Sequence, residues 1–546
     1  MKKLLFLLLL RKEHFLFFFL SVCSLPFFYC FSNEASYKII IEITATFIFA
    51  LLLYILTFNL YGWKARLVLY FVFLFNWIPT VIATSYILID RSFIRGKYLW
   101  ILFETTSSEA KEFIIEYANA WVFIFIGTYT STLLYLLIVK KKVREPATKL
   151  NAWIPFTAMV LLVLMILSPA AKAVCALDFY KSYFLYRQEL VYFLDSEKQR
   201  SVLKYKVVSE LPDTTEKTFI IIIGESLSRH HMQLYGYKRK TNPFLSQKSS
   251  ELIIYKDVIS PHTSTLNSLR TVLTMATNKD LNSFYSKPSI VDLFNSAGFD
   301  TYWIEAQNYV LRGASYGIIA RQAKHFYPLR LFRKYDHIAF PYINEALGNS
   351  EKKNKVIFIH LNGCHASYKV RYPASFNVFD HSRDHFFAEK TWLEEKDKSV
   401  IDQYDNAVLY NDYIVSSVID KVEKQNKCSF VIYFPDHGEE VYDFRTYSGH
   451  KFNNISRYMC EIPLILWTSK KYRALVNLNK DPSVPCSTED IIYSISDLAG
   501  LHYADYDSSK SIFSRHFRPN ERTVGNVSYI ALKNKSHEKI ISLDAP

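Results

Sequence analysis

Polar side chains follow three short apolar runs in the second half of the chain, and their types are those of metal ligands. They are Glu225 and Ser226 after 219–224, Cys364 and His365 after 356–360, and Asp436, His437 and Glu439 after 431–434. Carboxylates and imidazoles bind borderline and hard divalent cations, and zinc accepts this mixture in tetrahedral geometry. A DHG tripeptide alone also fits a turn that caps the next segment, but its position after an apolar run, together with GES after another, favours a metal site.

A hydroxyl group beside such a metal could act as a nucleophile, and the stretch 258–277 contains candidates. From Leu266 onward its apolar residues recur at helical spacing, which predicts a helix that begins near Thr265. The start of a helix presents free N–H groups and the positive end of the dipole to an anionic group. Spacing alone equally fits an ordinary N-cap, so a catalytic threonine requires a metal that lowers the pKa of its hydroxyl.

The elements around these residues follow an alternating pattern from Thr218 onward. Apolar runs at 219–226, 300–307, 355–363, 430–440 and 462–469 alternate with helical patterns at 288–299, 403–425 and 488–499. This alternation predicts an α/β fold, a mostly parallel sheet with helices on both faces. Ligands of such sheets bind beyond the carboxyl ends of the strands, which is where the polar residues stand.

The first third of the chain is different, because it contains five apolar stretches. They are 15–31, 39–60, 67–89, 120–139 and 153–175. A helix of about 20 residues crosses a hydrocarbon core of about 30 Å, and these stretches lack the polar face of a soluble core helix. No small-residue cleavage site follows the first stretch, so we interpret it as an uncleaved span. The sequence thus predicts a five-span α-helical membrane domain over 1–175.

The flanking charges predict the orientation of these spans. Eleven Lys and Arg residues flank one side, among them Lys2, Lys3 and Lys140–Lys142, and four flank the other. Basic loops stay in the cytoplasm, so we expect a cytoplasmic N-terminus and an outer location for everything after Cys175. In a Gram-negative cell this is a multi-pass inner-membrane protein with a periplasmic domain. We expect an amphipathic bridging segment over 176–215 and the catalytic domain over 216–546.

The net charge of +14 could also indicate a nucleic-acid partner. The chain has no zinc-finger spacing, no RNP-like aromatic motif and no long Lys/Arg run, so we expect no nucleic acid. Its seven cysteines show no metal-type spacing and leave any disulfide pairing open.

Five segments occur in an order that resembles a known family. They are GESLSRHHMQLYGYKRKTNPFL, the stretch around Thr265, HLNGCHASYKVRYP, DNAVLYNDYIVSSVI and YFPDHGEEVYD. Together they resemble the phosphoethanolamine transferases that modify lipopolysaccharide. The sequence TLNSLRTVLTMATNKD is most similar to the branch that acts on core heptose. The resemblance covers nearly the whole chain. It implies a five-span membrane domain and an alkaline-phosphatase/sulfatase-like catalytic domain.

The resemblance also implies roles for individual residues. Glu225, Thr265, Asp436 and His437 would hold a catalytic zinc ion, and Thr265 would be the nucleophile that carries phosphoethanolamine. His365 and His450 would bind the donor phosphate or a second zinc and protonate the leaving group, while Glu439 and Asn308 would lie near the ethanolamine or phosphate. The family's lipid A branch has SCGT where this chain has SPHTST, so Thr263 remains a competing nucleophile and the acceptor sugar stays open.

The implied reaction moves phosphoethanolamine from phosphatidylethanolamine to a lipopolysaccharide sugar or lipid A, through a covalent threonine intermediate, in a monomeric enzyme. A phosphoglycerol transferase that uses phosphatidylglycerol would share the metal and the threonine. A phosphodiesterase or sulfatase of the same superfamily is a further alternative, although the CxPxR-like motif of sulfatases is absent. A non-catalytic membrane sensor is disfavoured because Glu225, Thr265, Asp436 and His437 are all present.

Overall fold

A computed structural model divides the chain into two compact units, residues 1–189 and 190–546. It describes residues 12–32, 36–91, 93–96, 99–105, 110–111, 113–115, 118–138, 146, 149–200, 205–307, 315–329, 335–351, 353–383, 386–387, 392–451, 454–479 and 481–534. Asn308 and Lys140–Lys142 lie outside these residues. The border between the units falls within helix α9 (Cys175–Arg200). The predicted domain borders at 175 and 215 stay predictions.

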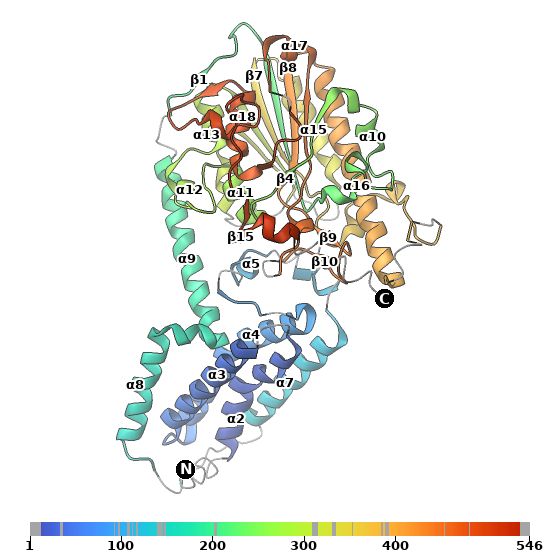
Figure 1. The fold of residues 1–546 in the computed structure, drawn as a ribbon. Coiled ribbons are helices and arrows are strands. Elements are labelled where there is room, and N and C mark those ends of the chain that lie inside the picture. Colours follow the sequence, from blue (N-terminus) through green and yellow to red (C-terminus); the bar gives the residue numbers. More distant parts are fainter. Residues whose placement is uncertain are drawn as a thin grey trace. The chain divides into compact units, whose positions relative to one another are not determined.

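The first unit consists of apolar helices, and within the described residues each of the five predicted apolar stretches is largely helical. The elements are α2 (Lys12–Cys23), the 3-10 helix η1 (Leu25–Phe31), α3 (Ser36–Thr57), α4 (Gly62–Asp90), α5 (Leu99–Glu104), α7 (Ala120–Ile138), α8 (Trp153–Leu167) and the 3-10 helix η3 (Pro169–Ala173) (Figure 1). Among the described residues, two helices, Ser36–Thr57 and Gly62–Ile89, are long and apolar enough to cross a membrane; the other three are shorter.

Large apolar side chains on the surface distinguish this unit. Trp63, Trp121 and Leu167 are 70%, 69% and 77% exposed, and many of their neighbours are exposed as well. Contiguous apolar surface of this kind is unfavourable in water and favourable in lipid. Inside the bundle, the buried Glu42 of α3 forms an ion pair with Arg95, which satisfies a charge that would otherwise be costly in an apolar surrounding.

The second unit is built on a seven-stranded sheet. In spatial order its strands are β3 (Leu252–Tyr255), β11 (Leu464–Thr468), β8 (Cys428–Pro435), β2 (Lys217–Gly224), β7 (Asn354–His360), β5 (Asp300–Glu305) and β6 (His325–Pro328). Strand β11 runs antiparallel to both of its neighbours, and the pairs β8–β2, β2–β7, β7–β5 and β5–β6 are parallel. The predicted mostly parallel sheet is therefore confirmed, with β11 as its reversed strand.

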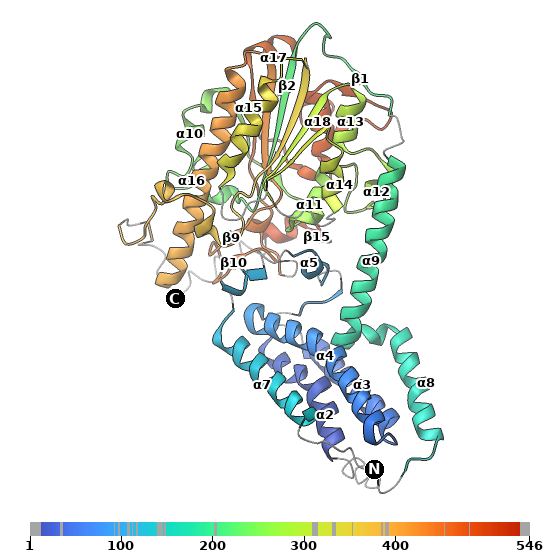
Figure 2. The same cartoon turned by 180° about the vertical axis from the view of Figure 1, so that it is seen from behind.

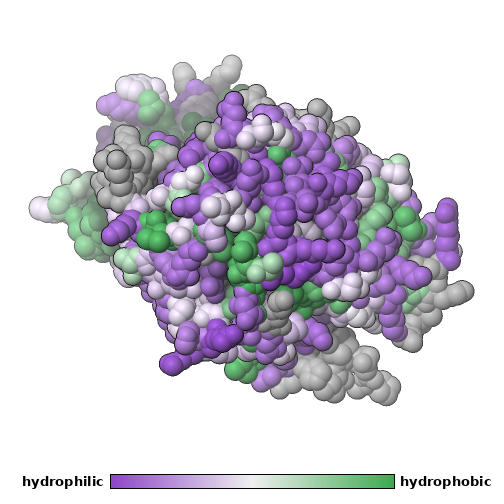
Figure 3. Space-filling model, turned by 90° about the horizontal axis from the view of Figure 1, so that it is seen from above, coloured by the Kyte–Doolittle hydropathy of each residue, from purple (hydrophilic) through white to green (hydrophobic). Residues whose placement is uncertain are grey.

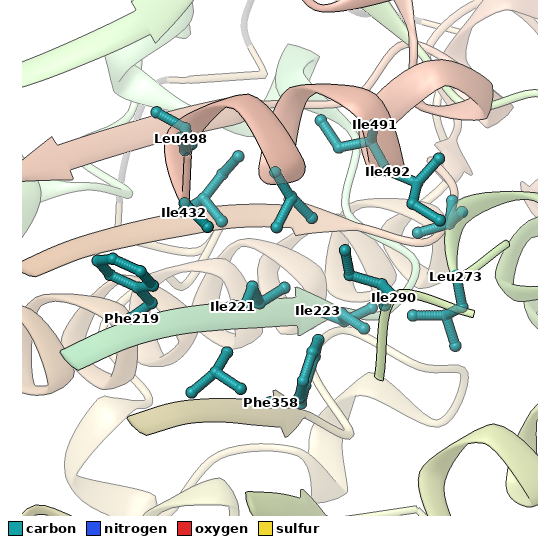
Figure 4. Packing of buried hydrophobic residues seen from close by; sticks show 14 of the residues in the cluster. Phe219, Ile221, Ile223, Leu273, Ile290, Phe358, Ile432, Ile491, Ile492 and Leu498 are labelled. Carbon is teal, nitrogen blue, oxygen red and sulfur yellow. The ribbon is translucent and has the colours of Figure 1, made fainter. Parts of the chain in front are cut away.

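Helices cover both faces of this sheet (Figures 1 and 2). One face carries α11 (Thr265–Val272), α13 (Ile290–Ser296) and α18 (Ile491–Leu498), and the other carries α10 (Pro243–Ser246), α15 (Phe340–Gly348) and α16 (Glu395–Glu423). In β2, Phe219, Ile221 and Ile223 pack toward the first group, as Figure 4 shows, whereas Ile220 and Ile222 pack toward the second. Both faces are apolar because the strand is buried on both sides.

Smaller elements complete the unit. They are α12 (Ser283–Ser286), α14 (Ser315–Arg321), α17 (Lys470–Leu475) and four two-stranded pairs: β1 (Val208–Ser209) with β13 (Leu501–His502), β4 (Val258–Ile259) with β12 (Cys486–Ser487), β9 (Glu440–Val441) with β10 (Ser448–Gly449), and β14 (Thr523–Val524) with β15 (Val527–Ser528). Figure 3 shows a face of the molecule on which hydrophilic residues predominate and hydrophobic ones form small patches.

The strand register determines what meets at the carboxyl edge. Gly224 at the end of β2 pairs with Pro435 at the end of β8, and Glu305 of β5 pairs with His360 of β7. The residues that follow these pairs therefore emerge side by side beyond one edge of the sheet.

Candidate metal and nucleophile site

A tight turn at the end of β2 presents Glu225. Ser226 has a left-handed backbone with φ of +53°, so the chain turns sharply directly after Glu225. The loop after β7 packs against this turn at Gly363, whose φ is +51° and where a Cβ would lie 2.8 Å from the Glu225 backbone nitrogen. A side chain at Gly363 would collide with the turn, so glycine at this position lets the two strand ends approach closely.

Asp436 follows β8 and is fixed through one of its two oxygens. Its Oδ1 accepts hydrogen bonds from the backbone N–H groups of Ser226, at 3.1 Å, and His437, at 2.7 Å. Its Oδ2 is buried and has no hydrogen-bond partner among the described residues. An unpaired buried carboxylate oxygen is costly unless a cation or donor is supplied from outside the chain.

His437 is held in one tautomer. Its Nδ1 lies 2.8 Å from the carbonyl oxygen of Gly438, which can only accept, so Nδ1 carries the hydrogen. The other nitrogen, Nε2, lies 3.4 Å from Glu225 Oε1 and 3.5 Å from Asp436 Oδ2, and makes no hydrogen bond within the described part of the chain. Anchoring of one ring nitrogen by a carbonyl is the usual arrangement of a metal-binding histidine.

The three side chains offer ligand atoms within 4.8 Å of one another, and all three are fully buried. Two carboxylates and an imidazole that can offer Nε2 in exchange for a proton suit zinc in composition. The orphaned Asp436 Oδ2 and His437 Nε2 thus fit the predicted metal, and the candidate site holds the ligand set Glu225, Asp436 and His437 together.

Thr265 is the first residue of α11, after Ser264 with extended backbone. Its hydroxyl donates to the Glu225 carboxylate, at 3.1 Å to Oε2 and 3.2 Å to Oε1. Thr263 is directed elsewhere, because its hydroxyl donates to the carbonyl oxygen of Lys451 at 2.8 Å. Of the two candidate nucleophiles, Thr265 is the one on the metal-ligand cluster, and its catalytic role remains a prediction.

The pKa shifts within the cluster indicate that His437 alone does not balance the two carboxylates. Burial and the neighbouring Glu225 raise the pKa of Asp436 to about 7. Burial would lower the pKa of His437, but Asp436 and Glu225 raise it to about 10. Burial would raise the pKa of Glu225, but His437 and His365 hold it well below its usual range. In the metal-free site, bound protons thus offset part of the negative charge of the two carboxylates, and a divalent cation would offset it more fully.

A second group of residues borders the cluster. The ring of His450 lies 4.3 Å from that of His437, centroid to centroid, and its Nδ1 lies 2.8 Å from Glu439 Oε2. Tyr368 donates to the other Glu439 oxygen at 2.7 Å. Glu439 is fully buried while His450 is 25% exposed, so the histidine is oriented from within and reaches solvent.

His365 and Asn308 complete the predicted set. His365 lies after β7, and its backbone carbonyl accepts a hydrogen bond from Arg371 Nε at 3.1 Å. The residue is half-buried and its charge acts on Glu225. Asn308 lies outside the described residues, so its role stays a prediction.

Two residues at the site were not predicted from the sequence. Gln307, directly before Asn308, donates through Nε2 to Glu225 Oε2 at 2.7 Å. Tyr368 reaches Glu439 from the segment after His365. The rule that located the other residues would have found Gln307, which follows the end of β5 by two positions, but a neutral amide does not stand out as a metal ligand.

Comparison with known proteins relates this geometry to a family. Residues 217–501 match the family model described as Sulfatase. Phosphoethanolamine transferase EptC of Escherichia coli (strain K12) is 29% identical over 485 residues, 82% of this chain and 83% of the relative. The crystal structure of the C-terminal periplasmic domain of EptC from Escherichia coli in complex with Zn is 33% identical, covers 59% of this chain and 92% of that one, and has a TM-score of 0.56.

A longer structural match covers both units. The integral membrane protein lipooligosaccharide phosphoethanolamine transferase A from Neisseria meningitidis covers 94% of this chain and 98% of its own, with a TM-score of 0.66 and 18% identity. At this identity the likeness shows the fold alone. It confirms the predicted fold class, a membrane helical domain joined to an alkaline-phosphatase/sulfatase-like α/β domain.

Proposed function

The chain belongs to the sulfatase family, and we propose that within it this enzyme transfers phosphoethanolamine from phosphatidylethanolamine to lipopolysaccharide. One observation supports this more than any other. The Thr265 hydroxyl donates to the Glu225 carboxylate, beside Asp436 Oδ2 and His437 Nε2, which are buried and have no hydrogen-bond partner among the described residues. A hydroxyl at a helix start and next to a cation site is equipped to attack a phosphorus atom. The names of the relatives support phosphoethanolamine as the group transferred.

We propose zinc as the metal, held by Glu225, Thr265, Asp436 and His437. When bound, zinc lowers the pKa of a hydroxyl ligand and stabilises negative charge on a phosphoryl oxygen. The donor types support this choice, and the related EptC domain has been crystallised with Zn.

In the first half-reaction, the Thr265 oxygen attacks the phosphorus of phosphatidylethanolamine. The bond between phosphorus and the diacylglycerol oxygen breaks, and Thr265 loses its proton to water. The leaving oxygen needs a proton, which His450 supplies, since Glu439 orients its ring and its exposed part reaches solvent for reprotonation. His365 is the second candidate for this proton. The products are diacylglycerol and phosphoethanolaminyl-Thr265.

In the second half-reaction, a sugar oxygen of lipopolysaccharide attacks the same phosphorus. The bond between phosphorus and Thr265 breaks, the acceptor loses its proton to the histidine and Thr265 regains one from water. Two successive displacements on one residue give ping-pong kinetics. We propose core heptose as the acceptor, on the resemblance of the Thr265 segment.

We further propose that the enzyme is a monomer in the inner membrane, with its catalytic unit in the periplasm. The apolar helices of the first unit and the names of the related periplasmic domains support this location. A reporter that is active only in the periplasm should be active when fused after residue 215 and silent when fused at Lys141. The reverse pattern would contradict the five-span topology.

Mass spectrometry of lipopolysaccharide tests the function directly. Cells that express the chain should gain one phosphoethanolamine unit per lipopolysaccharide, mapped to a core sugar, and cells that express Thr265→Ala should not. A gain of phosphoglycerol would favour the related transferase, and unmodified lipopolysaccharide from cells with folded enzyme would contradict the proposal.

A further inference from the structure

We propose that Gln307 is a positioning residue that orients the Glu225 carboxylate for metal binding. The inference rests on the proposed metal site but adds a residue that forms no part of its ligand set. Gln307 is buried, follows β5 by two positions and lies across β7 from Glu225. It is separated from Glu225 by 82 residues in sequence, so only the folded sheet brings the two together.

The amide of Gln307 has a defined orientation. Its Nε2 donates to Glu225 Oε2 at 2.7 Å and to the backbone carbonyl of Leu361 at 3.0 Å. Both partners are acceptors, so the amide nitrogen must face them, and a flipped amide would place its oxygen against two oxygens. The side chain thus spans the gap between β5 and the loop after β7 and ends on the carboxylate.

The backbone of Gln307 is anchored as firmly as its side chain. Its N–H donates to Glu305 Oε1 at 2.9 Å, and the same carboxylate interacts with His360 Nδ1 at 2.9 Å and accepts from Trp303 Nε1 at 2.9 Å. Glu305, His360 and Trp303 are fully buried. A buried carboxylate with three such partners cannot move without losing several charge-assisted hydrogen bonds, so Glu305 gives Gln307 a rigid base.

Glu225 is therefore held at both oxygens. Gln307 fixes Oε2, and the Ser226 hydroxyl donates to Oε1 at 2.8 Å. A carboxylate oxygen has two lone pairs, so each keeps one for the neighbouring Thr265 hydroxyl or for a cation. Without Gln307 the carboxylate could rotate, and part of the metal-binding free energy would go into ordering it. Residues that hold metal ligands in this way typically contribute 10–100-fold in affinity.

The test compares Gln307→Met with Gln322→Met in the purified full-length chain. Both changes replace a glutamine by an apolar side chain of similar length. Gln322 Oε1 accepts a hydrogen bond from the Ser289 hydroxyl at 3.1 Å and makes no contact with the proposed metal ligands among the hydrogen bonds of the described residues. Zinc affinity is measured by competition with a chromophoric chelator, and folding by the thermal unfolding temperature without metal. We expect a 10–100-fold loss of zinc affinity for Gln307→Met and none for Gln322→Met.

Different results would contradict the positioning role of Gln307 and the metal site itself. A Gln307→Met enzyme that unfolds like Gln322→Met and binds zinc as tightly as the unchanged chain would overturn the inference. Failure of the unchanged chain to bind zinc would instead refute the proposed metal site. Should Gln307→Met not fold, Gln307→Asn keeps the amide one methylene short of Glu225; it should also lose zinc affinity, and full affinity would contradict a positioning role.

Discussion

Two buried glutamates in the second unit have opposite surroundings. Glu461 accepts hydrogen bonds from Arg229 Nη2 at 2.8 Å, Arg457 Nη2 at 3.2 Å and Tyr529 at 2.6 Å, with His230 Nε2 at 2.5 Å. Glu225 is equally buried, but no arginine or lysine among the described residues forms an ion pair with it. Its Oε1 lies 3.4 Å from His437 Nε2, and the same nitrogen lies 3.5 Å from Asp436 Oδ2. One carboxylate is surrounded by the chain's own cations, and the other lies beside a second acid.

This difference is the one that we expect between an ion cluster that only stabilises the fold and one that binds a metal ion. Around Glu461, burial would raise the pKa of the carboxyl, but His230 and Arg229 lower it strongly, so the charge is balanced within the protein. Around Glu225, the pKa of Asp436 rises to about 7 because burial and the second carboxylate oppose its charge. A buried site that is short of positive charge and has unused ligand atoms is suited to a cation from solution, which is why we propose a metal at Glu225 and not at Glu461.

The largest effect is expected for Thr265, whose hydroxyl donates to Glu225 in the cluster that is short of positive charge. Thr265→Ala should abolish transfer. Among the described residues, the other hydroxyl that donates to Glu225 is that of Ser226, which is fully buried and so cannot replace Thr265 as the nucleophile. Ser264 is the N-cap of α11, so Thr265→Ala leaves the cap residue in place and the loss of a cap could not explain such a result. Peptide mass spectrometry after incubation with donor alone should find the phosphoethanolamine adduct on Thr265.

Thr263→Ala is the matched control, since it removes a neighbouring hydroxyl that binds the Lys451 carbonyl. This variant should keep the adduct and the activity. An adduct on Thr263 would reverse the assignment.

A large effect is also expected for zinc content. Asp436→Ala or His437→Ala removes one of the four proposed ligands and should strip tightly bound zinc and activity. We expect the unit to stay folded, because neither side chain belongs to the apolar layers that cover the sheet. Elemental analysis and circular dichroism of the purified variants measure both. Full zinc occupancy would show that the metal lies elsewhere.

In the cluster around Glu461, a substitution should lower the stability of the fold and leave the zinc content unchanged. Glu461→Gln leaves Arg229 and Arg457 without their counter-charge, and we expect a loss of about 3 kcal/mol in the free energy of unfolding, the lower end for a broken buried pair because both arginines are partly exposed. Zinc content should not change. Denaturant unfolding shows the stability, and loss of zinc in the folded variant would contradict the contrast drawn between the two glutamates.

A smaller, graded effect is expected from pH. In the metal-free enzyme the pKa of Asp436 is raised to about 7 and that of His437 to about 10, so the folded state binds protons that zinc must displace. Zinc affinity should rise by about a hundredfold per pH unit below pH 7, where both groups release a proton, and by about tenfold per unit between pH 7 and 10, where only His437 does. Calorimetry in buffers of different ionisation enthalpy counts these protons, and a flat profile would contradict the proton-filled cluster.

The same pKa shifts predict how the stability of the metal-free enzyme changes with pH. Both groups are more protonated in the folded than in the unfolded state, so stability should fall as pH rises, from about 4 to 7 through Asp436 and from about 6.5 to 10 through His437. Saturating zinc should flatten this dependence.

The sheet was largely predictable because its central strands carry continuous apolar runs. β2, β7 and β8 are buried on both faces, which gives them a pattern that few other segments share. The edge strands β3 and β6 are only partly buried, and the sequence analysis did not find them. The reversed direction of β11 depends on the connections around it and leaves no mark in its own residues.

The site was predictable where it follows strand ends and not where it depends on distant partners. Glu225, Asp436 and His437 converge because β2 and β8 are adjacent and in register. The contact that separates Thr263 from Thr265 is made by Lys451, 188 residues from Thr263, and no local pattern contains it. Gln307 was missed for a chemical reason, since its amide acts on a ligand and not on the metal.

The pairing of β2 with β8 determines when the site can exist. The hydrogen bond from Ser226 to Asp436 joins residues 210 positions apart, and the strands between them must be made before β8 can dock. Contacts of such separation form late, because the loop they close must be ordered first. A nascent chain that does not yet include β8 lacks the adjacent Asp436 and His437, so it cannot form the proposed zinc site.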